Sequence, residues 1–230
     1  MKHLLLSATL LLASAAIAPA ATSIILTGTV GTSDSSAYTP GQVITVSFTL
    51  ADYSATGDPL DYTDEEGEYD WYQEEAENAP IFGNATLTGS TGTFTMPSGD
   101  APEIFLYVST GIVPSTTYFM VVLGIDMEEP STIDLGLAVN GDPVRYFGFG
   151  FTTPTIFTGL AVPGTNPEEF LSTKLGTYDV EDVDNSYIEL VSGDRITFLP
   201  TTMEIAIIPE PSTALFSLAA VGLLLRRRRN

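Results

Sequence analysis

Short runs of alternating apolar and polar residues recur through most of the chain between residues 21 and 208. Residues 42–50, QVITVSFTL, show the alternation most clearly, after a turn at Thr39-Pro40-Gly41. Because successive side chains of a strand point to opposite faces, such runs are typical of strands with one buried face. We therefore predict a single all-β domain, an antiparallel β-sandwich of jelly-roll or immunoglobulin type. The expected strands lie at residues 23–30, 42–50, 85–88, 91–96, 104–109, 117–124, 133–139, 145–152, 155–161, 187–191, 195–199 and 203–208.

Two short stretches in this body have helical character, at residues 70–79 and 167–175. In the second, Pro167 suits the first turn of a helix, and Glu168 and Glu169 favour the positive end of the helix dipole. We expect at most these two helices between the terminal segments.

Residues 1–20 predict a secretory signal peptide, which forms an apolar helix. Lys2 gives a positive start, residues 4–17 are apolar or small, and Ala18 and Ala20 supply the small side chains that signal peptidase reads. We expect cleavage after Ala20, because cleavage after Ala18 would leave Pro19 at the start of the product. The alternative is a retained N-terminal anchor.

The C-terminal residues 209–230 form a second signal. Pro209-Glu210-Pro211 interrupts regular structure, because neither proline can donate a backbone hydrogen bond. An uncharged apolar run follows at residues 212–225, and Arg226, Arg227, Arg228 and Arg229 precede the final Asn230. An apolar helix before an arginine cluster is a stop-transfer pattern. At about 1.5 Å per residue the run is shorter than a bilayer core of roughly 30 Å, which favours a temporary transmembrane helix.

This order of tripeptide, apolar helix and arginine run resembles the PEP-CTERM sorting signal. The resemblance covers residues 209–230 and agrees with an N-terminal signal peptide. It implies an exosortase-type processing enzyme as a partner, an exported protein in the cell envelope or matrix, and a Gram-negative host that makes exopolysaccharide. It implies no catalytic residue and no particular fold. The alternative is an ordinary single-pass C-terminal anchor.

The residue types of the body limit its chemistry. The chain has no cysteine, and its one histidine, His3, lies in the predicted signal peptide. Ser-His-Asp and Cys-His catalysis and zinc sites built on Cys or His are therefore excluded from the body. We predict a protein without catalytic activity.

The body is strongly acidic. It has three cations, Arg145, Lys174 and Arg195, against 28 Asp and Glu, which gives a net charge near −25. Such a surface repels nucleic acid and anionic membranes and attracts cations. Nucleic acid is therefore not an expected partner. The charge also suits a secreted protein that must stay soluble, or a salty habitat.

The densest acidic segment, residues 58–77, is interpreted as a solvated excursion from the sandwich. Calcium is the alternative, with Asp64 and Glu66 among the candidate ligands, because hard cations prefer clustered oxygen ligands. An EF-hand is excluded, since Gly67 in the glycine position would put Tyr62 first and Gln73 last. Interleaved aromatic residues predict packing onto the body or stacking on sugar rings; they are Tyr62, Tyr69, Trp71 and Tyr72.

A second candidate calcium site contains Asp179, Asp182 and Asp184. In an extended segment alternate side chains share a face, so Asp182 and Asp184 could reach one ion together. The alternative is the acidic edge of a loop. We expect no obligatory cofactor, with calcium as the candidate ion.

Residues 124–128, GIDME, resemble the Glu-x-Asp-x-Glu strand of jelly-roll glycoside hydrolases that cut β-glucans. That resemblance implies a nucleophile at the first place and an acid/base at the last. Gly124 occupies the first place, and only Asp126 and Glu128 align, so a retaining mechanism lacks its nucleophile. We interpret the segment as a strand end that enters a turn.

The combined expectation is an exported envelope or extracellular-matrix protein, anchored transiently in the inner membrane and then released to the surface or beyond. Its expected partners are signal peptidase, the exosortase-type enzyme and extracellular polysaccharide of a biofilm. A calcium-assisted carbohydrate-binding sandwich is the first alternative. A glycosidase that uses paired carboxylates is the second.

Overall fold

The computed structural model describes residues 20–51, 61–65, 68–72, 81–95, 103–110, 115–124, 134–156 and 167–209. Residues 22–206 form one compact unit, and residues 1–21 with 207–230 form a second. Of the second unit only residues 20, 21 and 207–209 are described, as the ends of two strands. The fold below is that of the first unit.

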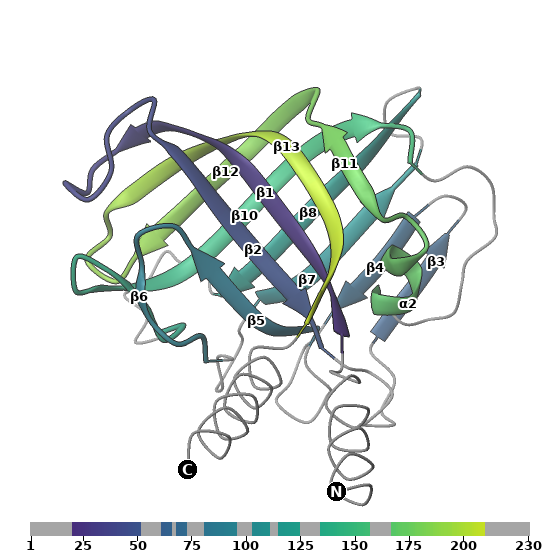
Figure 1. The fold of residues 1–230 in the computed structure, drawn as a ribbon, viewed down its shortest axis with the longest axis horizontal. Coiled ribbons are helices and arrows are strands. Elements are labelled where there is room, and N and C mark those ends of the chain that lie inside the picture. Colours follow the sequence, from purple (N-terminus) through teal and green to yellow (C-terminus); the bar gives the residue numbers. More distant parts are fainter. Residues whose placement is uncertain are drawn as a thin grey trace, which may run out of the picture. The chain divides into compact units, whose positions relative to one another are not determined.

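Antiparallel β-strands make up most of the described residues, with one short helix (Figure 1). The all-β prediction is confirmed. The strands are β1 (Ala20–Ser33), β2 (Val43–Leu50), β3 (Asp61–Glu65), β4 (Glu68–Tyr72), β5 (Phe82–Leu87), β6 (Thr91–Gly92), β7 (Glu103–Ser109), β8 (Thr116–Gly124), β9 (Leu137–Val139), β10 (Asp142–Pro154), β11 (Gly176–Asp179), β12 (Asp182–Leu190) and β13 (Arg195–Pro209), and the helix is α2 (Pro167–Ser172).

The strands belong to one sheet. Its main path runs β3-β4-β7-β8-β10-β12-β13-β1-β2-β5, with β11 beside β13, and β9 beside β10 and β6. Many neighbouring strands are not consecutive in the sequence, such as β8 with β10 and β13 with β1. Much of the strand pairing therefore joins distant parts of the chain. The first and last long strands of the body, β1 and β13, therefore lie side by side in the interior of the sheet.

The sheet curls over its own apolar face (Figure 1). The ring of Phe48 on β2 lies 5.6 Å from that of Phe147 and 5.8 Å from that of Phe149, both on β10. Three strands, β12, β13 and β1, separate β2 from β10 along the sheet. Contact between their side chains therefore requires the sheet to close over a shared core, which also contains Phe198 of β13, 5.5 Å from Phe149.

Most residues of β10 are buried on both faces of the strand. Phe147, Phe149 and Phe151 point into the core with no exposed surface. Between them stand Gly148 and Gly150. A Cβ on Gly148 would lie 2.5 Å from the ring of Tyr146, and one on Gly150 would lie 2.8 Å from the Tyr118 hydroxyl. Tyrosine rings therefore cover the glycines on the outer face, a common way to protect a glycine strand.

The sequence pattern predicts two strands at residues 195–199 and 203–208, but the structure has one continuous strand, β13. Pro200 does not break it, because β13 changes neighbours there. It pairs with β12 through Thr197 and with β11 from Thr202 onward. A proline is tolerated where its missing N–H would have had no ladder partner.

The acidic segment 58–77 contributes a hairpin to the sheet. β3 pairs with β4, and β4 pairs with β7. The predicted helix at 70–79 is wrong for residues 70–72, which belong to β4, and residues 73–79 lie outside the described residues. Pairing with β7 overrides the weak local preference of this segment. The interpretation as an excursion from the sheet is likewise incorrect for the two strands.

The predicted helix at 167–175 is present in shorter form as α2. Phe170 and Leu171 are buried, with 1% and 0% exposure, and dock the helix on the core. The carboxylate of Glu168 accepts a hydrogen bond from the Thr22 backbone N–H at 3.4 Å. This contact connects the first turn of α2 to the start of β1.

Candidate functional site

A cluster of charged and aromatic side chains lies where β10, β12 and β13 meet. A bulge in β10 creates it. Val144 pairs with Leu190 and Tyr146 with Glu189, so Arg145 is an extra residue in the ladder. A bulge redirects the side chains around it. Arg145 is thereby placed to reach Glu189 on the neighbouring strand.

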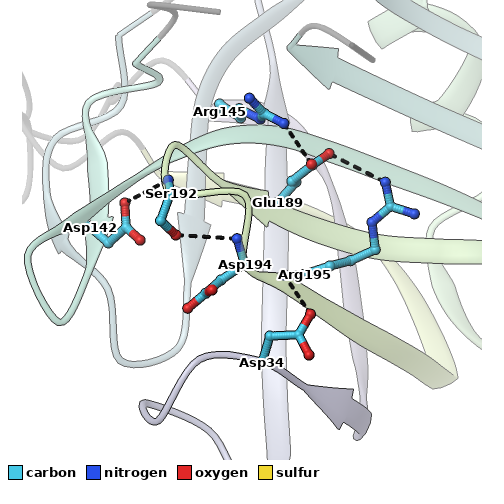
Figure 2. A network of polar contacts seen from close by, with 7 residues as sticks. All are labelled: Asp34, Asp142, Arg145, Glu189, Ser192, Asp194 and Arg195. Atoms are coloured by element: carbon cyan, nitrogen blue, oxygen red, sulfur yellow. Dashed lines mark hydrogen bonds and ion pairs between the residues drawn. The ribbon is translucent and has the colours of Figure 1, made fainter. Parts of the chain in front are cut away.

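Glu189 is held between two arginines (Figure 2). Arg145 Nη2 donates to Glu189 Oε1 at 2.6 Å, and Arg195 Nη2 lies 3.6 Å from Glu189 Oε2. The side chains of Arg145 and Glu189 are 9% and 8% exposed, whereas that of Arg195 is 51% exposed. The first contact is a buried, charge-assisted hydrogen bond, and the second is a longer ion pair beside solvent.

The buried pair is incompletely satisfied. Arg145 Nε is inaccessible to solvent and has no hydrogen-bond partner among the described residues. Glu189 Oε2 also has none there, although Arg195 contributes the ion pair. Burial of two ions carries a desolvation penalty that their attraction must offset. The pair therefore depends on both partners remaining charged.

An aromatic stack adjoins the ion pair. The rings of Tyr146 and Tyr187 are stacked with centroids 5.1 Å apart, and the Arg195 guanidinium lies 4.1 Å from the centroid of Tyr187. Arg195 thus makes a cation–π contact while it faces Glu189. The aromatic rings shield the ion pair from water and hold β10, β12 and β13 together on the outer face.

The turn between β12 and β13 completes this polar network (Figure 2). Ser192 N donates to Asp142 Oδ1 at 3.3 Å, and Asp194 N donates to Ser192 Oγ at 3.2 Å. Asp34 accepts from Arg195 N through Oδ2 at 3.4 Å and donates its own N–H to Arg195 O at 3.1 Å. These bonds fix four strand ends. With its carboxylate held by two guanidinium groups, Glu189 is poorly suited to act as a general base, so the cluster is built for structure.

The structure places the predicted calcium ligands Asp179, Asp182 and Asp184 on two strands, β11 and β12. Asp182 and Asp184 alternate along β12, opposite Thr152 and Gly150, and both are exposed. Asp179 lies on β11, opposite Thr202. Within the described ranges no group of three or more Asp, Glu, His or Cys side chains is arranged to hold a metal ion. Calcium therefore remains a prediction.

Asp184 does influence a nearby tyrosine. Burial raises the pKa of Tyr118, and the negative charge of Asp184 and the neighbouring Tyr107 raise it further. The rings of Tyr107 and Tyr118 meet edge to face at 6.1 Å. This tyrosine pair with an exposed carboxylate beside it was not singled out by the sequence pattern.

Strand register places three of the aromatic residues that were considered for sugar stacking opposite β7. Trp71 is opposite Leu106, and Tyr69 is opposite Val108, two positions whose side chains are fully buried. Tyr72 is opposite Phe105, which is partly exposed. Asp64 lies on β3 opposite Tyr69, and Glu66 lies outside the described residues.

The two predicted sorting signals fall largely outside the described residues. Ala20 is the first residue of β1, and Pro209 is the last of β13. Ala18, Glu210, Pro211 and Arg226–229 are not described, nor are Asp126 and Glu128; Gly124 is the last residue of β8. Among the helices that are described, none has the length and apolar character needed to span a bilayer.

The Arg145–Glu189–Arg195 cluster was missed by sequence reasoning. The available signal was Arg145 itself. An arginine inside an apolar strand such as 144–151 requires a carboxylate partner. The identity of the partner depended on the β10 bulge. The sequence matches no protein-family model, no curated protein and no solved structure.

Proposed function

We propose that this chain is an exported cell-envelope or extracellular-matrix protein without catalytic activity, sorted and released through residues 209–230. The observation that carries the proposal is the order Pro209-Glu210-Pro211, apolar run 212–225 and arginines 226–229 behind an N-terminal leader. A leader directs export, and the apolar run before arginines holds the chain in the inner membrane until it is processed.

The body agrees with this assignment in three respects. The sheet begins at Ala20 and ends at Pro209, so its limits coincide with the proposed signals. Its core is apolar and contains no cysteine, and thus needs no disulfide for stability. Its net charge near −25 suits a soluble protein in a hydrated matrix and disfavours nucleic acid as a partner. We assign signal peptidase and an exosortase-type enzyme as processing partners and extracellular polysaccharide as the surroundings.

The test is the intact mass and location of the protein from its native host. We expect a mature chain that begins near Ala21, lacks Arg226–229 and is found outside the inner membrane. A variant with all four terminal arginines replaced by Gln should accumulate unprocessed. A wild-type chain that keeps its full tail in the membrane fraction would refute the sorting proposal.

We propose carbohydrate binding as the second function, and one contact on the outer face supports it. Tyr107 and Tyr118 form an edge-to-face pair on the outer face, with the exposed Asp184 close enough to raise the Tyr118 pKa. Aromatic rings beside carboxylates are suited to sugar rings, and calcium at Asp182 and Asp184 would strengthen such a site. In this proposal the curled sheet acts as a lectin-like sandwich.

A glycan array with and without calcium tests the carbohydrate-binding proposal. Binding should disappear in a Tyr118→Ala variant, and no binding of the wild type in either condition would remove the proposal.

A further inference from the structure

The last strand of the body is an interior strand of the sheet. β13 lies between β1 on one side and β12 followed by β11 on the other. Gly176 of β11 pairs with Ile205, and the pairing with β11 stops there, before the strand ends at Pro209. Met203 and Ile205 have 0% and 1% exposure. An interior strand with buried side chains opens far less readily than a terminal segment at the surface.

The start of β1 and the end of β13 are neighbours. Asp34 bonds to Arg195, Thr32 to Thr197 and Thr27 to Thr201, so the two strands run antiparallel. The same direction, continued along the pair, brings Thr22 to the level of Ala206. Thr22 is 2% exposed. The start of β1 and the end of β13 therefore belong to central strands of the sheet (Figure 1).

On the basis of the sorting function proposed above, we infer that the folded sheet withholds the tail from its processing enzyme. Release at Pro209–Pro211 then requires that the end of β13 opens, or that cleavage precedes its pairing. Only residues 206–208 lie between the buried Ile205 and the motif. An enzyme that cuts a peptide takes several residues on each side of the cut as an extended chain. It cannot take strand residues that are still paired with a neighbouring strand, and β13 lies beside β1 along the sheet.

The chemistry of release places no further demand on the body. One peptide bond breaks, its acyl carbon passes to a nucleophile of the enzyme and then to water or an amine, and the new amino group leaves with the tail. The body determines only how often the bond becomes accessible. When opening is fast relative to cleavage, the rate follows the population of the opened state.

The two cuts differ in timing because the chain is exported from its N-terminus. The leader can be removed at Ala20 while β13 is still inside the cell, when β1 lacks one of its two neighbours. Residues 209–211 leave the cell last, after every strand of the body. Leader removal therefore precedes completion of the sheet, whereas tail removal competes with it.

The experiment is a pulse–chase of tail processing in the native host. A flexible Gly-Ser linker of about six residues is inserted between Ile208 and Pro209, which lengthens the chain between sheet and motif without changing the motif or the apolar run. The matched control carries the same linker after Pro40, in the exposed turn between β1 and β2. We expect the first insertion to shorten the half-life of the unprocessed chain several-fold and the control to leave it unchanged.

A second variant tests the same inference without an insertion. Ile205→Ala removes a buried anchor at the end of β13 and should also accelerate processing, because the strand end opens more often. Equal half-lives for wild type, linker variant and Ile205→Ala overturn the inference and leave the sorting function intact. If neither the wild type nor the linker variant is ever processed, both the inference and the sorting function fall.

Discussion

At the level of single residues, Glu189 is the most consequential side chain of the described structure. Among the described residues, Glu189 forms ion pairs with both Arg145 and Arg195. We predict that Glu189→Gln lowers the free energy of unfolding by about 3 kcal/mol, near the lower end for a broken buried pair, because Arg145 keeps its charge but loses its anion. Urea denaturation of the body measures this loss.

Two further variants separate the buried contact from the exposed one. Arg195→Gln should cost no more than about 1 kcal/mol, because its side chain is 51% exposed and its ion pair is screened by water. The double variant Arg145→Met with Glu189→Leu should regain most of the stability, since neither charge is then buried. A loss for Arg195→Gln as large as that for Glu189→Gln would contradict this account.

Tyr38 gives the body a dependence on alkaline pH. Its hydroxyl donates to the Thr88 carbonyl at 2.5 Å, and burial raises its pKa from 10.0 to about 12. Above pH 10 the unfolded state loses this proton before the folded state does, so stability falls as pH rises. We predict unchanged stability up to about pH 9 and a decline between pH 10 and 12 of up to about 1.4 kcal/mol per pH unit.

The matched variant for this prediction is Tyr38→Phe, which keeps the ring and removes the titrating hydroxyl. Its free energy of unfolding should be lower at neutral pH, through the lost hydrogen bond, but it should show a shallower decline above pH 10. Thermal melts at a series of pH values provide the comparison. Parallel declines for the two proteins would show that another group controls the alkaline limit.

Among the strands, the pair β1–β13 depends on one glycine. A Cβ on Gly28 would lie 2.1 Å from the Leu199 carbonyl oxygen and 2.5 Å from the Cα of Pro200, both backbone atoms that cannot move aside alone. Gly28→Ala should therefore separate the two strands and destabilise the body by about 3 kcal/mol, as forced overpacking does. Urea denaturation and amide hydrogen exchange on β1 and β13 measure the effect.

Gly83 on β5 is the matched control. The nearest atom to its added Cβ would be Ala51 Cα at 3.5 Å, an ordinary contact. Gly83→Ala should be neutral or slightly stabilising, because alanine restricts the unfolded chain. If both alanine variants have the same stability, the close approach at Gly28 has no energetic consequence.

The strands that were predicted well are those whose core side chains alternate without interruption. In β10 the spacing of Phe147, Phe149 and Phe151 identifies the core face directly. The β3–β4 hairpin was missed because its acidic residues resemble those of a solvated loop. Pairing with β7, a partner that is distant in sequence, turns this segment into strands. The predicted division of β13 at residues 199–203 was wrong because the change of neighbour that tolerates Pro200 is not a local property.

The candidate site was less predictable than the fold. Residue types excluded histidine and cysteine chemistry at once, but they did not identify the charged cluster. The partnership of Arg145 with Glu189 follows from a one-residue bulge, and no local pattern marks where a ladder shifts register. Whether Asp182 and Asp184 gain a third ligand is likewise a matter of long-range placement.

For the whole molecule, charge is the property with the widest consequences. The body has 28 carboxylates and three cations, and two of these cations share Glu189. Most carboxylates therefore have no cation of the chain to pair with. A net charge this far from zero keeps the protein dispersed but destabilises the compact state through self-repulsion. The apolar core must offset that repulsion, and dissolved cations reduce it.

We therefore predict that sodium chloride raises the melting temperature of the body at pH 7, most steeply below about 0.15 M, where the screening length is still longer than about 8 Å. Near pH 4 the effect should shrink, because many carboxylates are then protonated and the repulsion is weaker. Calorimetry at the two pH values provides the comparison, and a melting temperature at pH 7 that does not change with salt would contradict it.

Calcium chloride at equal ionic strength then distinguishes general screening from a specific site. A further rise in melting temperature that Asp182→Asn with Asp184→Asn abolishes would identify those two carboxylates as ligands, because monovalent screening does not depend on any single pair.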